Sequence, residues 1–329
     1  MIIMKIKYMV KIYYKVLIGV LMVLILIGCK RYGEKLFLNP VPGSCTIFSA
    51  SIEDKVLFGN NEDGKDQNTC YWTEPGDSEN YGCLYLGFEN DQLQGGINEK
   101  GLCFDANSLP KSKLNPHHEL PNPPFAKPPY EKYTVWAPVT MLRKAATVQE
   151  AIEIAGRYQR RNWDRGSSYL SYQVFLADST GDAVVISAGK DGELAFTRKK
   201  SGDGYLVSTN FNRANPGNAW SYPCWRYNKA IEMLAKIHSE NDLTEDYFKS
   251  ILDSVHVEGA TGNTLYSNIF DLRKGIIYLY YWHQYNEVVK LNVKQQLTKG
   301  KICVRLSDLF SKETVDKVQT EFQKYNEKK

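Results

Sequence analysis

Short runs of residues in which apolar side chains alternate with polar ones, or stand together, follow one another from residue 45 onward. In the first half they predict strands at residues 46–50, 56–59, 83–88 and 101–106. Apolar residues then recur at helical spacing over residues 135–145 and 148–158. Thr147 and Glu150 stand in the pattern of a capping box, which predicts that the second of these helices begins there.

The second half repeats this order of strands and then helices. Strands are predicted at residues 172–177, 183–187, 194–197 and 205–209, and helices at 225–238 and 245–255. Strands return at 264–269, 276–282 and 288–293, and residues 306–325 predict a terminal helix. This order indicates sheets covered by helices. Because no internal repeat or clean linker divides the chain, we interpret residues 45–329 as a single domain.

One segment between the two halves is rich in proline. Residues 108–132 hold seven of the 13 prolines of the chain. Proline has no backbone N–H for a strand ladder, and it interrupts a helix, so we expect a long surface loop here. The segment also contains His117 and His118. They have no partner at metal-ligand spacing, and we interpret them as surface residues rather than metal ligands.

The first residues have the pattern of an export signal. Lysines at positions 5, 7, 11 and 15 precede an apolar run at residues 16–27, which is shorter than the roughly 20 residues of a comfortable membrane span. The run ends at Gly28-Cys29, in a sequence that resembles the lipobox of bacterial lipoproteins. We therefore predict a lipoprotein-type signal peptide at residues 1–28, lipidation of Cys29, and a tether or propeptide at residues 29–44. An uncleaved signal anchor and simple secretion are the alternatives.

These features predict an exported protein of the bacterial cell envelope, held to the membrane through a lipid on Cys29. They also explain the formal charge of +4, because seven of the 41 basic residues but only one of the 37 acidic residues precede Cys45. The remaining 34 basic and 36 acidic residues leave a body with a net charge of −2. Such a body offers no electrostatic argument for binding nucleic acid.

Seven cysteines in an exported chain permit disulfides. Cys29 and Cys45 have other candidate roles, and the five that remain cannot all pair. Cys70 and Cys83 flank a short polar segment, so they form the one disulfide that we predict. For most of the others, Cys103 among them, an interpretation as small buried hydrophobic residues is at least as good.

Of all these residues, Cys45 is the one whose position indicates the most specific chemistry. It opens a segment, residues 45–64, that predicts one β-hairpin ending in the carboxylate of Asp63. If the chain is cut before Cys45, this residue carries both a thiol and a free α-amine, which are a nucleophile and a base. Their unperturbed pKa values, roughly 8.5 and roughly 8, lie close enough to neutrality for a carboxylate and hydrogen bonds to adjust them. Such a site needs no catalytic histidine.

Five segments together resemble the N-terminal nucleophile (Ntn) cysteine hydrolases, the group that contains choloylglycine hydrolases, penicillin V acylases, acid-ceramidase-like amidases and acyl-CoA:6-aminopenicillanate acyltransferases. The segments are residues 45–63, 96–107, 175–185, 208–210 and 221–227. The resemblance spans nearly the whole chain after residue 44. It implies an α+β fold, a four-layer αββα sandwich of two antiparallel sheets covered by helices. It also implies that Cys45 is the nucleophile and that Asp63 orients its terminal amine.

The same resemblance implies roles for three further residues. Asn107, which follows the turn at residues 98–102, matches a contributor to the oxyanion hole whose backbone N–H does the work. Asn210 matches an amide that donates to the tetrahedral intermediate, and Arg226 matches an arginine that braces the active site. An ordinary loop asparagine at position 107 and a solvated arginine at the start of a helix are the alternatives.

The chain departs from the family pattern beside Asn61. The bile salt and penicillin V branch carries an arginine directly before this asparagine, where the chain has Asn60. Stabilisation of a Cys45 thiolate, or binding of an anionic substrate group, must then come from elsewhere, with Arg226 as the candidate. The acyltransferase-like branch, in which this position is often uncharged, fits the sequence better. We expect Asn60 and Asn61 to support the site.

The function implied is hydrolysis of linear amide C–N bonds in a small N-acyl amide. After removal of the propeptide, the α-amine of Cys45 would take the thiol proton, an acyl-thioester would form on Cys45, and water would hydrolyse it. No metal or organic cofactor is required. The alternatives are an acyltransferase that uses the same thioester, an envelope lipoprotein that binds a ligand without catalysis, and a Cys–His thiol protease. None of His238, His256 and His283 lies in a recognisable partner motif for the last of these.

Overall fold

The computed structural model describes residues 45–89, 92–115, 136–157, 163, 169–219, 222, 224–259 and 262–326. The predicted signal peptide, Cys29, the segment at residues 29–44 and the two histidines at positions 117 and 118 lie outside these described residues. Within them, no helix is both long enough and apolar enough to cross a membrane.

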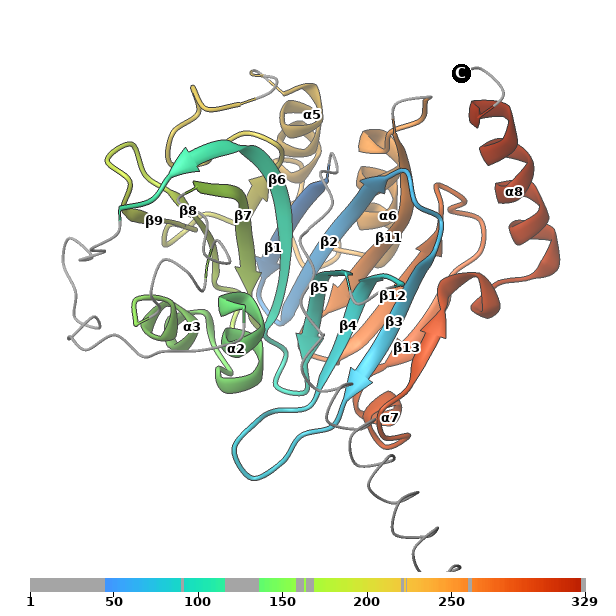
Figure 1. Cartoon of the computed structure of the whole chain (residues 1–329), viewed down its shortest axis with the longest axis horizontal. Coiled ribbons are helices and arrows are strands. Elements are labelled where there is room, and N and C mark those ends of the chain that lie inside the picture. Colours follow the sequence, from blue (N-terminus) through green and yellow to red (C-terminus); the bar gives the residue numbers. More distant parts are fainter. Residues whose placement is uncertain are drawn as a thin grey trace, which may run out of the picture. The chain divides into compact units, whose positions relative to one another are not determined.

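Two antiparallel sheets form the centre of the structure (Figure 1). The first has six strands in the order β10-β1-β2-β11-β12-β13. Its strands are β1 (Thr46–Ile52), β2 (Lys55–Gly64), β10 (Tyr205–Ser208), β11 (Asn263–Asp271), β12 (Ile276–Tyr281) and β13 (Val289–Asn292). The hairpin predicted after Cys45 is formed by β1 and β2, in which Thr46 pairs with Asn61.

The second sheet has eight strands in the order β14-β3-β4-β5-β6-β7-β8-β9. Its strands are β3 (Thr69–Glu74), β4 (Cys83–Phe88), β5 (Gln92–Asn98), β6 (Cys103–Lys113), β7 (Tyr169–Ala177), β8 (Ala183–Ala188), β9 (Leu194–Arg198) and β14 (Cys303–Arg305). Most neighbours in this sheet follow one another in the sequence, so it is largely an up-and-down meander.

Helices cover the outer face of each sheet (Figure 1). Helices α2 (Ala137–Lys144) and α3 (Val148–Ala155) lie on the side of the second sheet, and α5 (Trp225–Leu234) and α6 (Glu245–Val255) on the side of the first. The C-terminal part adds α7 (Val293–Leu297), the 3-10 helix η1 (Leu306–Leu309) and α8 (Lys312–Asn326). The capping box of Thr147 and Glu150 is present at the start of α3. The predicted αββα sandwich is therefore confirmed.

Side-chain alternation along β2 divides its residues between two cores. Phe58 belongs to the core between the sheets, where its ring stacks on Phe270 with centroids 5.5 Å apart. Leu57 belongs to the core between the first sheet and its helices, together with Phe48 and Phe248. The same alternation directs the even-numbered residues that follow on β2 between the sheets and the odd-numbered ones toward the helices.

Three strands, β3, β5 and β14, and one strand ending were not predicted. The strands β3 and β5 contain buried polar residues and two glycines, which hide the apolar alternation. Residues 108–113, predicted as the start of a loop, instead continue β6. Pro110 lies where the register with β7 shifts between Ser108 and Ser112, so its missing N–H falls at an interruption of the ladder. Residues 116–132, the rest of the proline-rich segment, lie outside the described residues.

The predicted disulfide between Cys70 and Cys83 is wrong, because both cysteines are free. In the β3–β4 hairpin, Cys70 pairs with Gly87, whereas Cys83 pairs with Glu74. The two cysteines are therefore offset along the strands by four residues, or about 13 Å. A disulfide needs Cα atoms within roughly 7 Å of each other.

Candidate active site

Cys45 immediately precedes β1, and only 2% of its surface is exposed. Its thiol donates a hydrogen bond to Glu62 on the neighbouring strand β2, with Sγ and Oε2 3.3 Å apart. Burial, and then the carboxyl groups of Glu62, Asp63 and Asp105, raise the pKa of the thiol well above its usual range. This thiol therefore needs a base or a compensating positive charge before it can act as a nucleophile.

Arg226, in the first turn of α5, links three separate segments around Cys45. Its Nη1 donates to Thr46 Oγ1 at 3.0 Å and lies 3.3 Å from Asp63 Oδ2, and its Nη2 donates to Asn210 Oδ1 at 2.8 Å. The guanidinium side chain is 8% exposed and that of Asp63 1% exposed, so this ion pair is buried. The arrangement fits the bracing role expected for Arg226, and not a solvated arginine at a helix start.

Asp63 faces the helices, on the side of β2 opposite Glu62. Besides Arg226, it accepts a hydrogen bond from the hydroxyl group of Thr264 on β11. Burial raises the pKa of Asp63 to about 7, although Arg226 and Thr264 both act to lower it. Burial is the largest of these effects and outweighs the ion pair.

The side chain of Asn107 on β6 holds the backbone of Cys45. Its Nδ2 donates to the Cys45 carbonyl oxygen at 3.0 Å, and its Oδ1 accepts from the hydroxyl group of Ser208. Gln173 on β7 supports Ser208 in turn through a 2.9 Å hydrogen bond from Nε2. The expected contribution was the backbone N–H of Asn107, and the sequence did not indicate this positioning contact of its side chain.

Asn210 follows β10 and has its amide oriented by two fixed partners. Arg226 can only donate, so it fixes Oδ1 on its own side, and Nδ2 donates to the carbonyl oxygen of Ser108 at 2.9 Å. The structure thus brings together all five residues that the family pattern indicated: Cys45, Asp63, Asn107, Asn210 and Arg226.

The two adjacent asparagines of β2 point to opposite faces. Asn61 faces the helices, donates to the carbonyl oxygen of Leu252 on α6 at 2.9 Å and accepts from Ser267 Oγ at 2.7 Å. Asn60 lies between the sheets, where its Nδ2 donates to Asp105 Oδ2 at 2.8 Å. At the position where the resemblance implies an arginine in the bile salt and penicillin V branch, this chain therefore has an amide that is engaged with a carboxyl group.

Glu62 and Asp105 form a buried acid pair beside the thiol. Asp105 projects from β6, and Gly95 on β5 makes room for it, because a Cβ at that glycine would lie 2.5 Å from Asp105 Oδ2. Burial and then the charge of Asp105 raise the pKa of Glu62 well above its usual range, and burial raises the pKa of Asp105 to about 8. Three atoms here make no hydrogen bond within the described residues: Glu62 Oε1, Asn60 Oδ1 and the hydroxyl of Tyr266.

Neither residue of this acid pair was predicted. Each lies within a run of buried residues in a strand, and carboxylates are almost never fully buried unless they are paired. An acidic residue within such a run is the signal that was available in the sequence. It does not show which partner lies opposite, because Glu62 and Asp105 belong to different sheets.

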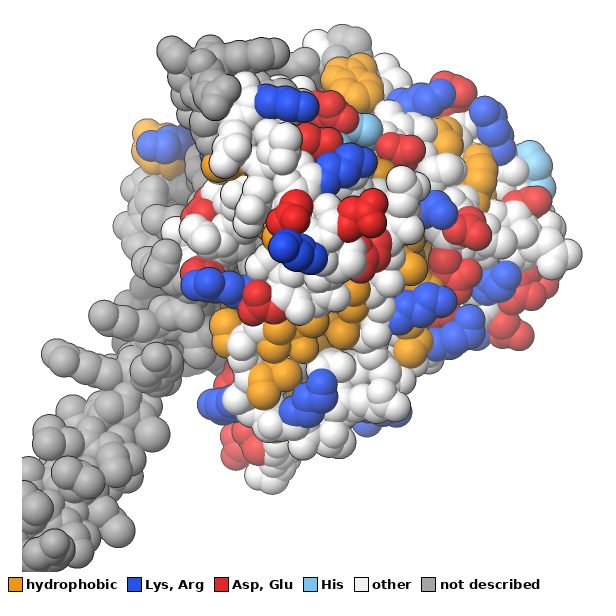
Figure 2. Space-filling view, turned by 90° about the vertical axis from the view of Figure 1, so that its right-hand side faces the viewer, with side chains coloured by type: hydrophobic (Ala, Val, Ile, Leu, Met, Phe, Trp, Pro, Cys, Tyr) orange, Lys and Arg blue, Asp and Glu red, His pale blue; other side chains and the backbone are white. Residues whose placement is uncertain are grey.

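The charge around Cys45 differs from that of the surface. On the face shown in Figure 2, basic and acidic side chains are interspersed rather than gathered by sign. Around the thiol, by contrast, three carboxyl groups lie close enough to raise its pKa, and one of them, Asp63, is paired with Arg226. No group of three or more His, Cys, Asp or Glu side chains within the described ranges is placed to hold a metal ion.

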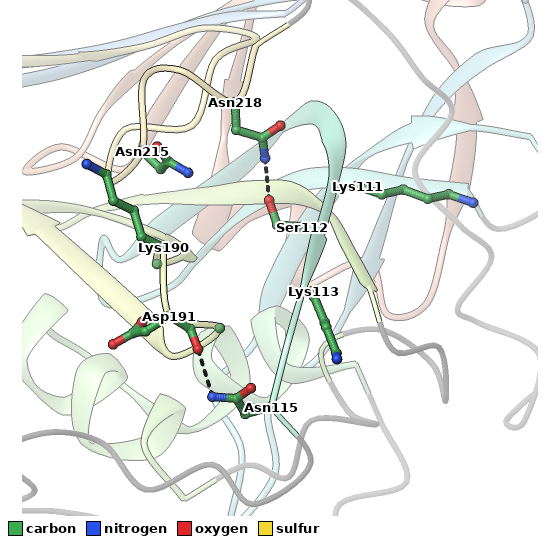
Figure 3. Close-up of a pocket in the computed structure, with 10 residues that line it drawn as sticks. Lys111, Ser112, Lys113, Asn115, Lys190, Asp191, Asn215 and Asn218 are labelled. Carbon is green, nitrogen blue, oxygen red and sulfur yellow. Dashed lines mark hydrogen bonds between the residues drawn. The ribbon is translucent and has the colours of Figure 1, made fainter.

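A surface pocket lies at the distant end of β6 (Figure 3). Its volume is about 320 Å³, and it is lined by residues 111–113, 115, 189–192, 215 and 218. Lys111, Lys113 and Lys190 point in different directions, so their charges do not converge on one position. Ser112 follows Asn107 by five residues, or about 16 Å along a strand, which separates this pocket from the thiol.

Comparison with solved structures identifies the architecture. A variant of conjugated bile acid hydrolase from Clostridium perfringens aligns with a TM-score of 0.58 and 17% identity over 82% of this chain and 98% of its own. A second variant of that enzyme aligns with a TM-score of 0.55 and 16% identity over 79% and 96%. Penicillin V acylase from Agrobacterium tumefaciens aligns with a TM-score of 0.53 and 15% identity over 77% and 87%.

The chain has the Ntn-hydrolase fold. The resemblance inferred from the five sequence segments is thereby confirmed at the level of the fold. No protein-family model matches the sequence, and no curated protein does. At these identities, the shared Ntn-hydrolase fold is what the comparison establishes.

Proposed function

We propose that the protein is an N-terminal cysteine hydrolase of linear amides, which acts on small N-acyl amides. The observation that carries this proposal is that Asp63, Arg226, Asn107 and Asn210 gather around Cys45, directly before β1, on an Ntn-hydrolase fold. Two of the enzymes that share this fold, conjugated bile acid hydrolase and penicillin V acylase, support a hydrolytic activity of this class.

The proposed reaction begins when the free α-amine of Cys45 accepts the thiol proton. The thiolate attacks the amide carbonyl, and the amide N–H groups of Asn210 and of residue 107 stabilise the oxyanion. Arg226 keeps the Asn210 side chain in the orientation that presents Nδ2 as a donor. The leaving amine takes the proton, and water then hydrolyses the acyl-thioester on Cys45.

Removal of residues 29–44 is part of this proposal, because the nitrogen of Cys45 is a peptide nitrogen until the chain is cut. A new α-ammonium group would add a second positive charge to a site with three carboxyl groups and one arginine. It would lower the pKa of both the thiol and Asp63, which burial raises in the uncut chain. Cleavage thus supplies a nitrogen that acts as the base while it is a neutral amine and carries a second positive charge once it is protonated.

Localisation belongs to the same proposal. We infer an exported precursor with a lipid on Cys29, from which cutting before Cys45 separates the enzyme. An acyltransferase that uses the same thioester differs only in the nucleophile that resolves it. The thiol-protease alternative is less favoured, because the partner of the Cys45 thiol among the described residues is Glu62 and not a histidine.

The experiment is hydrolysis of a panel of N-acyl amides, bile conjugates, penicillin V and N-acyl amino acids, together with intact mass measurement. We expect wild-type protein with a mass that begins at Cys45, and loss of roughly 10³-fold or more in rate for Cys45→Ala. Asn210→Ala should lose roughly 10² to 10³-fold. Cys303→Ala, which changes an exposed cysteine, is the matched control and should keep full activity.

Two results would contradict the proposal. One is hydrolysis that persists undiminished in Cys45→Ala. The other is a fully active molecule whose mass includes residues upstream of Cys45, because it would have no α-amine at that position to act as the base.

A further inference from the structure

The uncut chain needs a proton-transfer group other than the α-amine. The nitrogen of Cys45 is then part of a peptide bond and carries no basic lone pair, so it cannot take the thiol proton during the cleavage that creates the new chain end. Among the described residues, the side chain that contacts this thiol is that of Glu62, with Oε2 at 3.3 Å from Sγ.

The carboxyl group of Glu62 contacts the thiol through one oxygen, and the side chain of Asn60 also acts on it to lower its pKa. Oε2 accepts from Cys45, whereas Oε1 is buried and makes no hydrogen bond within the described residues. Tyr266 pairs with Glu62 in the register of β2 and β11, and its hydroxyl group is also buried without a hydrogen bond there. A fully buried polar atom without a partner requires an explanation, and a role in catalysis is one.

We propose that Glu62 transfers the protons in the cleavage of the Ser44–Cys45 bond, and that the mature enzyme uses the α-amine of Cys45 instead. This inference rests on the proposed function, because it concerns how the same nucleophile is exposed. It gives the two bases separate tasks: a carboxyl group for maturation and an amine for turnover.

Both proton transfers of this step pass through one carboxyl group, that of Glu62. Glu62 Oε2 accepts the thiol proton and Oε1 gives its own proton to the Cys45 nitrogen in the same step in which the bond from Cys45 Sγ to the Ser44 carbonyl carbon forms, so the carboxyl group never carries two protons. The tetrahedral intermediate, with a negative oxygen and a protonated nitrogen, then collapses as the C–N bond breaks. The products are a Ser44 thioester on Cys45, a free α-amine and a neutral Glu62. Water hydrolyses the thioester and restores the thiol.

The surroundings of Glu62 favour the protonated form that this step requires. Cys45 faces it from directly before β1, Tyr266 from β11 and Asp105 from β6. Asp63 and its partner Arg226 lie toward the other face of β2. Burial and the like charge of Asp105 raise the pKa of Glu62 well above its usual range, which favours the protonated carboxyl group.

The test is the rate of self-cleavage in Glu62→Gln, followed by intact mass. Glutamine keeps the shape and an acceptor oxygen but cannot exchange protons, so we expect cleavage roughly 10²-fold slower, or more, than in the wild-type chain. Glu99→Gln is the control, because Glu99 accepts from the backbone N–H of Gly82 and not from Cys45. It should mature at the wild-type rate.

Rescue separates this chemistry from a folding defect. A protease recognition sequence placed directly before residue 45 in the full chain allows the purified protein to be cut externally. After such cutting, Glu62→Gln should hydrolyse the amide substrate within about tenfold of wild type treated in the same way. Asp105→Asn, which removes the like charge, should move the loss of self-cleavage at high pH to lower pH, because it lowers the pKa of Glu62.

The outcomes distinguish this inference from the proposed function. Self-cleavage of Glu62→Gln at the wild-type rate would overturn it, as would a variant that stays inactive after external cutting when the wild type is active. A wild-type chain that never cuts itself would also overturn it. In that case, the activity measured after external cutting would test the proposed function separately. The mass measurement alone decides the role of Glu62 even if no amide is hydrolysed.

Discussion

The two faces of β2 place neighbouring carboxyl groups in opposite surroundings. Toward the helices, Asp63 meets the Arg226 guanidinium and accepts a hydrogen bond from Thr264. Between the sheets, Glu62 meets a thiol and a second acid, Asp105, with no cation among the contacts described there. Two adjacent residues of one strand therefore differ: Asp63 is paired with a cation, whereas Glu62 lies beside another acid.

This difference shows how one residue type can serve two tasks in one site. Arg226 and Thr264 both favour the charged form of Asp63, which can then orient a cationic chain end. Burial and then Asp105 favour the neutral form of Glu62, which can accept a proton on one oxygen while it donates one from the other. The alternation of the strand, rather than the chemical identity of the side chains, assigns the roles.

Removing the cation from the helix-facing side should have the largest effect on stability. Arg226→Met keeps an apolar stem but leaves Asp63 buried without its ion partner, which we expect to cost about 3–5 kcal/mol of unfolding free energy at pH 8. The loss should be smaller at pH 5, because the folded-state pKa of Asp63 is about 7 and the group is then protonated. Urea unfolding at the two pH values measures both effects.

The control for this prediction is an exposed ion pair. Lys249→Met removes the partner of Asp246, whose side chain is 88% exposed, and should cost less than about 1 kcal/mol. If Arg226→Met costs no more than this control at pH 8, the two faces of β2 do not differ as described.

How much of this was predictable from the sequence follows from the same geometry. The strand pattern and the family resemblance indicated the layers, and they indicated five residues that the structure brings together around Cys45. Pairing inside a hairpin was predictable for β1 and β2, whereas the disulfide prediction failed because it required the register of β3 and β4. Contacts between sheets, such as that of Glu62 with Asp105, depend on how two separate sheets pack, and no local pattern encodes this.

Neutralising the acid pair between the sheets should stabilise the protein at high pH. The pKa of Asp105 is about 8 in the folded state, above its ordinary 3.8, so the folded state retains a proton that the unfolded chain has lost. Its contribution to stability therefore falls as pH rises from about 4 to 8. Asp105→Asn removes this titration, and we expect it to be more stable than wild type at pH 8 by on the order of a few kcal/mol, but not at pH 4.

Asparagine also suits the contacts at this position. Asn60 now donates to Asp105 Oδ2, and its own Oδ1 makes no hydrogen bond within the described residues. If the side-chain amide of Asn60 flips, its Oδ1 accepts a hydrogen bond from the new side-chain amide at position 105. Asp246→Asn, at an exposed site, is the control and should leave the pH dependence nearly unchanged. A pH dependence for Asp105→Asn that parallels the wild type would contradict the buried acid pair.

The smallest expected effect concerns a neutral contact on the helix-facing side. Ser267 donates to Asn61 Oδ1 at 2.7 Å, while Asn61 Nδ2 remains bonded to the carbonyl oxygen of Leu252. Ser267→Ala removes one hydrogen bond between uncharged groups, which should cost about 1 kcal/mol at every pH from 5 to 8. Among the described residues, the ionisable group bonded to the Ser267 hydroxyl is Tyr285, which titrates above this range. A loss that changes between pH 5 and pH 8 would instead mean that Asn61 is coupled to Asp63, and the helix-facing side would then have to be treated as one titrating network rather than as an ion pair beside a neutral contact.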